Sequence, residues 1–149
     1  MMEEQVILVN EQDEPIGLMN KLEAHEKAIL HRAFSVFVLN KNNEIMLQQR
    51  AHQKYHSPLL WTNTCCSHQR NGETNIQAGT RRLFEEMGFK TELKELFHFI
   101  YKTYIESKPV IIKLIKCFQG LNKVNLYKNL RNLNHGKTQC GLNSARLKN

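Results

Sequence analysis

The sequence predicts one α/β domain, in which a mixed sheet packs against helices as an α/β/α sandwich. Three observations support this fold class. The chain has 149 residues, enough to bury the core of a single domain. Short runs rich in β-branched and aromatic residues alternate with turn residues. One clear amphipathic helix lies among them, and strands interspersed with helices favour this class.

The first half of the chain predicts strands separated by short turns. β-branched residues mark the strands, and clusters of Pro, Gly, Asn and Asp mark the turns. In order, the expected elements are a strand at 5–10, a turn at 13–17, a polar helical turn or loop at 21–28, a strand at 33–39, a turn at 40–43 and a strand at 44–49.

The one clear helix is expected at residues 75–87. Ile76, Leu83 and Met87 recur at spacings that place them on one helical face. Gly88 follows directly, and glycine at this position readily adopts the left-handed conformation that ends a helix. We therefore expect this helix to bury one face against the sheet.

Further strands are expected on either side of the helix. Residues 62–67 are short and β-like, and residues 96–104 and 110–118 resemble a strand pair. After Gly120, Leu or Val recurs every three to four residues among many Asn residues. Because Asn is a poor helix former, this tail predicts at most a weak amphipathic helix.

The composition is that of an ordinary globular protein. Hydrophobic residues make up 41% and charged residues 23% of the chain. No apolar run is long enough to span a membrane, and the acidic N-terminus lacks the apolar segment of a secretion signal. Four cysteines, two of them adjacent, do not suggest a disulfide framework. We therefore expect a cytoplasmic protein with reduced thiols.

The charge is distributed unevenly along the chain. The formal net charge is +7, but residues 1–106 hold all 14 acids with 12 Lys and Arg, whereas residues 107–149 hold nine Lys and Arg and no acid. Such a basic tail is one pattern of nucleic-acid binding. The tail lacks interleaved aromatic residues, which argues against a nucleic-acid site.

A thiol, an imidazole and two carboxylates are the candidate side chains for catalysis and metal binding. Cys66 lies two residues before His68, and Glu85 and Glu86 lie near the C-terminal end of the expected helix. Acids there oppose the helix dipole, which favours a functional reason for them. Because neighbours on a strand point to opposite faces, only one of Cys65 and Cys66 can face a site.

The segment from Ser67 to Phe89 resembles a Nudix box, the loop-helix-loop that holds a divalent cation against a diphosphate. The positions that match are Glu73, Arg81, Leu83, Glu85, Glu86, Gly88 and Phe89. Ser67 stands where the box opens with Gly, and Arg82 stands where hydrolases carry a metal-binding Glu. An Arg removes a metal ligand and adds a bidentate phosphate clamp, so it favours holding a diphosphate over cleaving it.

Residues 3–106 as a whole resemble the type 1 isopentenyl-diphosphate isomerases of the Nudix superfamily. The resemblance therefore implies a Nudix-like α/β/α sandwich. The landmarks that match are Lys21, His25, His31, Gln49-Arg50-Ala51, Lys54, Pro58, Trp61-Thr62-Asn63, Cys66, His68, Gly72-Glu73, Arg81-Arg82, Glu86 and Tyr101.

The resemblance also implies roles for individual residues. His25, His31 and His68 match ligands of a buried metal, for which imidazole suits Zn²⁺ or Mn²⁺. Glu86 matches a carboxylate of the diphosphate-associated Mg²⁺ site. The cationic diphosphate pocket would consist of Lys21, Arg50, Lys54 and Arg82, and the catalytic side chains would be Cys66 and Tyr101.

The reaction implied is the isomerisation of isopentenyl diphosphate to dimethylallyl diphosphate. A proton adds to the alkene, which gives a tertiary carbocation-like species, and another proton leaves from the opposite face. A buried site is needed because water would capture such a cation. The implied partner is thus a small allylic or homoallylic diphosphate, with no membrane partner, and the oligomeric state is left open.

The last third of the chain departs further from the family pattern. A Glu-x-Glu pair, which completes the metal site and supplies the second proton-transfer group, is expected at positions occupied by Ile111 and Lys113. A shielding Trp in the last third is also absent, since Trp61 is the only Trp. We therefore hypothesise that residues 107–149 are degenerate or frame-shifted, so that the fold is incomplete at its C-terminus and activity is impaired. Alternatives are a Nudix diphosphate hydrolase, a basic binding protein and an inactive remnant.

Overall fold

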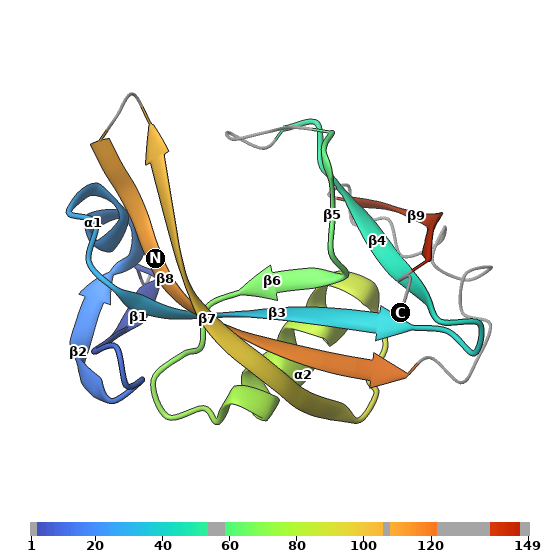
Figure 1. Cartoon of the computed structure of the whole chain (residues 1–149), viewed down its shortest axis with the longest axis horizontal. Coiled ribbons are helices and arrows are strands. Elements are labelled where there is room, and N and C mark those ends of the chain that lie inside the picture. The colour runs from blue at the N-terminus through green and yellow to red at the C-terminus, as the bar shows by residue number, and fades with distance from the viewer. Residues whose placement is uncertain (1–2, 54–58, 106–107, 122–137, 147–149) are drawn as a thin grey trace.

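The computed structural model describes residues 3–53, 59–105, 108–121 and 138–146 (Figure 1). In chain order the elements are β1 (Gln5–Val9), β2 (Pro15–Asn20), α1 (Lys21–Glu26), β3 (His31–Leu39), β4 (Glu44–Arg50), β5 (Trp61–Thr62), β6 (Cys65–Ser67), α2 (Asn75–Met87), β7 (Leu93–Ile105), β8 (Lys108–Leu121) and β9 (Thr138–Arg146).

The central sheet is mixed, as the sequence predicted. β3 pairs with β6 in antiparallel register on one edge and with β8 in parallel register on the other. β7 pairs with β8 in antiparallel register, which gives the local order β6-β3-β8-β7. β4, β5 and β9 form a second group of paired strands, which leans away from the central sheet in Figure 1.

α2 packs across one face of this sheet because its ends and its apolar face are well defined. Thr74 forms a capping box with Gln77, which satisfies free backbone N–H groups of the first turn. Gly88 ends the helix at φ 76°, as its position in the sequence predicted. The helix buries Leu83 and Met87 against the strands, but Ile76, which was expected on the same face, is 40% exposed.

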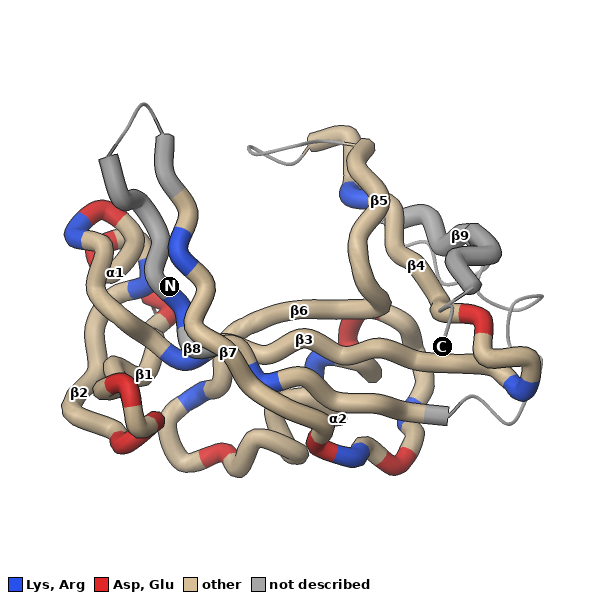
Figure 2. The backbone as a smooth tube through the Cα atoms, in the orientation of Figure 1, with Lys and Arg blue, Asp and Glu red and all other residues tan. Residues whose placement is uncertain are grey.

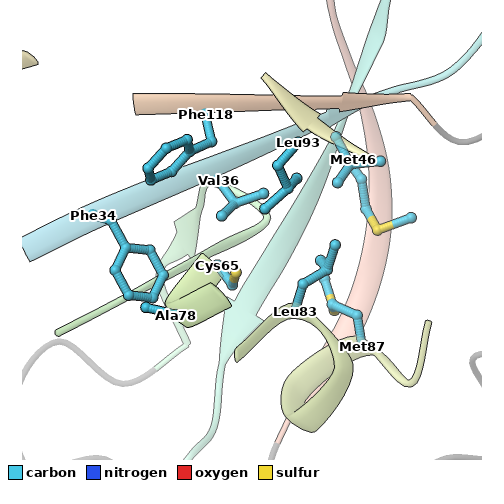
Figure 3. Close-up of a cluster of buried hydrophobic side chains, with 10 residues drawn as sticks. Phe34, Val36, Met46, Cys65, Ala78, Leu83, Met87, Leu93 and Phe118 are labelled. Carbon is cyan, nitrogen blue, oxygen red and sulfur yellow. The ribbon is translucent and has the colours of Figure 1, made fainter. Parts of the chain in front are cut away.

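The main core lies between α2 and the even-numbered residues of β3. Phe34 and Val36 project toward α2, and the ring of Phe34 meets that of Phe118 edge-on, with centroids 6.4 Å apart (Figure 3). Phe118, Val36 and Leu83 are fully buried. Phe118 therefore places β8 in the core of the domain, although it belongs to the basic C-terminal third.

The opposite face of β3 carries the candidate site. His31 and Ser35 alternate with the core residues, so their side chains leave the sheet on the side away from α2. Cys65 is paired with Val36 and is fully buried in the core, whereas Cys66 is paired with Ser35 and is exposed. The expectation that only one of the two cysteines faces the site is confirmed.

α1 lies over the site face at the start of β3. It contacts β8, β2 and β1, and its His25 ring lies 5.0 Å from that of His31. The two helices therefore cover opposite faces of the sheet, which makes the fold an α/β/α sandwich. Neither described helix has the length and apolar character that a membrane crossing requires.

Several elements differ from the expected ones. The segment expected to be only a turn at 13–17 runs into strand β2, which pairs along its length with β1. The β-like segment at 62–67 is two strands separated by buried Thr64, which accepts a hydrogen bond from the backbone N–H of Val38. The expected strand pair at 96–104 and 110–118 is confirmed as β7 and β8, both somewhat longer than expected.

In the C-terminal third, β8 and β9 are strands of the sheet system. β9 pairs antiparallel with β4, an element that the sequence did not suggest. Most of the segment expected to be a weak helix, at 122–137, lies outside the described residues.

An ion-pair network fastens β8 to the N-terminal hairpin. Asp13 Oδ1 accepts a hydrogen bond from Arg32 Nε at 2.8 Å, and Asp13 Oδ2 lies 2.9 Å from Lys116 Nζ. The three side chains are largely buried, so the pairs are shielded from solvent. Figure 2 shows basic positions of β8 in blue at the end of the strand that lies near α1 and β1.

Candidate metal and substrate site

Three histidines from separate segments converge on one point. α1 carries His25 in its last turn, β3 begins with His31, and the chain leaving β6 carries His68. One nitrogen from each ring lies within 4.8 Å of the others. His31 is fully buried and His68 is 7% exposed, so the cluster is largely closed to water.

The histidine cluster has the chemistry of a metal site. Nε2 of all three rings is buried without a hydrogen-bond partner, which is costly unless a ligand takes these atoms. His31 Nδ1 lies 2.8 Å from the carbonyl oxygen of Ile29, so Nδ1 carries the proton and Nε2 keeps its lone pair.

Burial keeps these imidazoles neutral. Desolvation, followed by the positive charge of Lys113, lowers the pKa of His25 to about 4 and that of His68 to about 2. Desolvation also lowers the pKa of His31. Neutral imidazoles offer lone pairs at pH 7, so the cluster fits a divalent ion of the zinc or manganese type.

Lys113 lies beside this cluster. Its Cα is directly opposite that of His31 in the parallel pairing of β8 with β3, so both side chains leave the same face of the sheet. On the other side of β8, Lys113 is opposite Tyr101 of β7. Burial lowers the pKa of Lys113. Its charge nevertheless lowers the pKa of His25 and His68, so position 113, where the family resemblance expects a carboxylate, adds positive charge to the site.

Cys66 lies on the site face of β6. Its side chain is exposed, while the protein around it and then the nearby Glu86 carboxylate raise the pKa of the thiol. Lys113 is also close enough to act on this pKa in the opposite direction. At neutral pH the thiol is therefore protonated and can donate a proton.

α2 presents an arginine and carboxylates next to this thiol. Arg82 Nη2 lies 2.5 Å from Glu86 Oε1, and Arg82 Nη1 lies 3.2 Å from Glu85 Oε2. Glu86 Oε2 and Arg82 Nε are buried without a hydrogen-bond partner. These free atoms, one anionic and one cationic, are suited to a Mg²⁺ ion and a phosphate oxygen, respectively.

The remaining box residues form a rigid support. Arg81 holds Glu73 with two hydrogen bonds, at 2.5 and 3.1 Å, and this pairing is the main cause of the lowered pKa of Glu73. Arg81 also contacts Glu85 at 3.3 Å. The pairing ties the loop before α2 to the helix that carries Arg82.

The other residues predicted for the site are distributed around it. Lys21 begins α1 and pairs with Glu4 at 3.0 Å. Arg50 ends β4, and its charge acts on the Cys66 thiol. Tyr101 is 44% exposed on β7. Lys54 lies outside the described residues.

Sequence reasoning missed one residue near the histidine cluster. Glu4 Oε1 lies 3.9 Å from His68 Nδ1. An isolated acid before a strand has no pattern that marks it as functional, so only its position in the fold reveals it.

A separate groove lies on the outer face of α2, away from the histidines. It is lined by Ile76, Thr80, Phe84 and Lys90, among others. The ammonium of Lys90 lies 5.2 Å from the centre of the Phe84 ring. None of the residues predicted for the site lines this groove.

Comparison with known proteins gives a consistent result. The family profile described as NUDIX domain matches residues 29–118. Isopentenyl-diphosphate Delta-isomerase 2 of Aromatoleum aromaticum is 53% identical over 106 residues, which are 71% of this chain and 56% of that protein. Isopentenyl-diphosphate Delta-isomerase of Serratia proteamaculans is 47% identical over 120 residues, which are 80% of this chain and 67% of that protein.

Solved structures show the same fold. The crystal structure of DR0079 from Deinococcus radiodurans matches with a TM-score of 0.59 at 20% identity, over 78% of this chain and 72% of that one. A NUDIX hydrolase from Nitrosomonas europaea matches with a TM-score of 0.51 at 18% identity, over 76% and 71% of the two chains. The chain spans between 56% and 67% of the length of these two curated relatives. The match to the NUDIX family profile ends at residue 118, eleven residues beyond position 107.

Proposed function

This chain belongs to the Nudix family, in its isopentenyl-diphosphate isomerase branch, and from that premise we propose that its site binds a small allylic or homoallylic diphosphate and is built for isomerisation of its double bond. The observation that carries the proposal is the convergence of His25, His31 and His68 on the face of the sheet that also carries Cys66. These residues come from three separate segments, α1, β3 and the stretch from β6 to His68, and a hydrolase box alone does not require them.

The substrate's charge would be held at the α2 end of the site. Arg82 is held by Glu85 and Glu86 and keeps a buried free N–H for a phosphate oxygen. A Mg²⁺ ion at Glu86 would neutralise the diphosphate charge. We propose that Lys21, Arg50 and Lys54 complete this cationic pocket, in keeping with the match to the family.

The proton transfer would begin at Cys66. The raised pKa keeps its thiol protonated at neutral pH, so it can deliver a proton to an alkene that lies over β6. We propose that the ring of Tyr101, which is opposite Lys113 in the pairing of β7 with β8, faces the positive charge that develops on the substrate. A cation of the zinc or manganese type held by the three imidazoles would act as a Lewis acid beside this centre.

This chain lacks the second proton-transfer group at the position where the family pattern has it. Isomerisation is balanced only if one group adds a proton and another removes one, and position 113 holds Lys where the family pattern has a carboxylate. An ammonium beside a developing carbocation is repulsive, by about 3–4 kcal/mol at a separation of about 4–5 Å and an effective dielectric constant of about 20. We therefore expect turnover to be impaired by two or more powers of ten, roughly.

The test is interconversion of isopentenyl and dimethylallyl diphosphate in the presence of Mg²⁺. The chain as it stands should show little or no turnover, and the double variant Ile111→Glu with Lys113→Glu should show a clear gain. Adding Cys66→Ala to the double variant should abolish that gain. Full turnover without the added carboxylates would show that the proton-transfer group has been misplaced.

Two alternatives follow from the same site. Hydrolysis of a nucleoside diphosphate derivative is disfavoured because Arg82 occupies the position of a metal-binding Glu and pairs with Glu86; phosphate release from a panel of such compounds would revive it. If diphosphate binds and the double variant still fails to turn over, the chain is an inactive remnant. Resequencing of the gene tests whether residues 107–149 are frame-shifted.

A further inference from the structure

Glu4 is fixed next to the histidine cluster by contacts of its backbone and side chain. Its backbone carbonyl accepts a hydrogen bond from the N–H of Lys21 at 2.9 Å. Its Oε2 pairs with Lys21 Nζ at 3.0 Å, and its Oε1 lies 3.9 Å from the buried Nδ1 of His68. The chain before β1 therefore delivers a carboxylate to the rim of the cluster.

The cluster needs a carboxylate that β8 does not provide at position 113. Its three imidazoles are neutral, and Lys113 and Lys21 add positive charge beside them. Divalent ions of the zinc and manganese type are commonly bound by imidazoles together with carboxylates. Among the described residues, no other carboxylate forms an ion pair with one of these histidines.

We propose that Glu4 supplies the carboxylate ligand of the histidine centre in this chain. Donor atoms about 2.0–2.1 Å from a tetrahedral zinc lie about 3.4 Å from one another. Both ring nitrogens of His68 are buried without a hydrogen-bond partner, so Nδ1 can be its ligand atom. The present separation of 3.9 Å between Glu4 Oε1 and His68 Nδ1 is close to that value. The Glu4 side chain is 53% exposed, so it has room to turn toward an ion.

The charge balance explains why Glu4 would matter here. A carboxylate at this place offsets the charge of Lys113, on whose pKa Glu4 already acts. Binding an ion would break the ion pair between Glu4 and Lys21. This pair is exposed, and exposed ion pairs contribute little to stability, so the cost of breaking it is small. The inference rests on the proposed metal centre but not on isomerase turnover.

The experiment compares metal binding by the whole chain and two variants. Glu4→Gln removes the proposed ligand, and Glu3→Gln removes the neighbouring carboxylate, which instead bonds to the side chain of Asn20. Zn²⁺ affinity is measured by competition with a coloured chelator. Visible absorption of the Co²⁺ form reports the ligand set, and thermal melting of the metal-free proteins confirms that all three fold.

The expected result is a loss of Zn²⁺ affinity of about tenfold or more in Glu4→Gln, with a changed Co²⁺ spectrum, and no change in Glu3→Gln. Equal affinities for all three proteins would overturn the inference. So would a loss of affinity with an unchanged Co²⁺ spectrum, because Glu4 would then act only through its charge. If the unaltered chain binds neither ion, the metal centre itself is refuted and the Glu4 inference falls with it.

Discussion

Replacing Lys113 by Met should strengthen metal binding at the histidine cluster. The change removes one positive charge and keeps the length and apolar stem of the side chain. Lys113 is directly opposite His31 across the parallel pairing of β8 and β3, and its charge lowers the pKa of His25 and His68. The same charge must oppose a cation bound by these rings.

The size of the effect follows from the position of the charge. Neighbouring strands lie about 5 Å apart, which puts the ammonium roughly 7 Å from an ion held by His31. A unit charge and a divalent ion then repel by about 2–5 kcal/mol at an effective dielectric constant of about 20–40. Even the lower value corresponds to a gain in affinity of about thirtyfold.

The assay is a Zn²⁺ titration against a chelator of known affinity, at one pH and one ionic strength. Lys94→Met is the matched control, because Lys94 is exposed on β7 and pairs with Gln119, six residues along β8 from Lys113. Equal Zn²⁺ affinity in the original chain and in Lys113→Met would refute the reasoning. An equal gain in both variants would assign the effect to overall charge and would refute it as well.

Three further predictions concern stability and substrate binding. In metal-free protein the free energy of unfolding should fall as the pH is lowered from 6.5 to about 4. In this range the imidazoles of the unfolded chain bind protons, whereas buried imidazoles such as His25 stay neutral in the folded chain. Urea unfolding at several pH values measures this free energy, and a value that does not change with pH would contradict the prediction. Gly120→Ala should destabilise the fold by about 1–3 kcal/mol, because a Cβ at this position would lie 2.6 Å from a threonine methyl group. Gly17→Ala is the control: a Cβ there would lie 3.9 Å from the nearest side-chain atom, so the same denaturation assay should show little change. Arg82→Gln should weaken Mg²⁺-dependent diphosphate binding about tenfold, as measured by calorimetry, and the exposed control Arg70→Gln should not.

The helix and the inner strands could be predicted because their signals are local. The apolar spacing of Leu83 and Met87 and the stop at Gly88 define α2 within one stretch of sequence. β2 was missed because Pro15 and Gly17 are typical turn residues. Pairing with β1 overrides that preference, and no pattern within the segment itself reports such pairing.

The site was predictable only in part, for a related reason. His25, His31 and His68 are separated by loops, so spacing alone does not bring them together; the resemblance to a family does. Position 113 was identified as a departure from the pattern, and the structure places its lysine beside the cluster. Glu4 escaped notice because its role depends on how the start of the chain lies against α1, which no sequence signal describes.

The order of strands in the central sheet has a consequence for biosynthesis. β8 separates β7 from β3, and in the described part of the chain it is the strand with which β7 pairs. While the chain emerges from the ribosome, the backbone N–H and C=O groups and the apolar side chains of β7 stay unpaired until β8 has been translated. Nascent chains stalled before β8 should therefore be more prone to aggregation, and more dependent on chaperones, than chains that include residue 121.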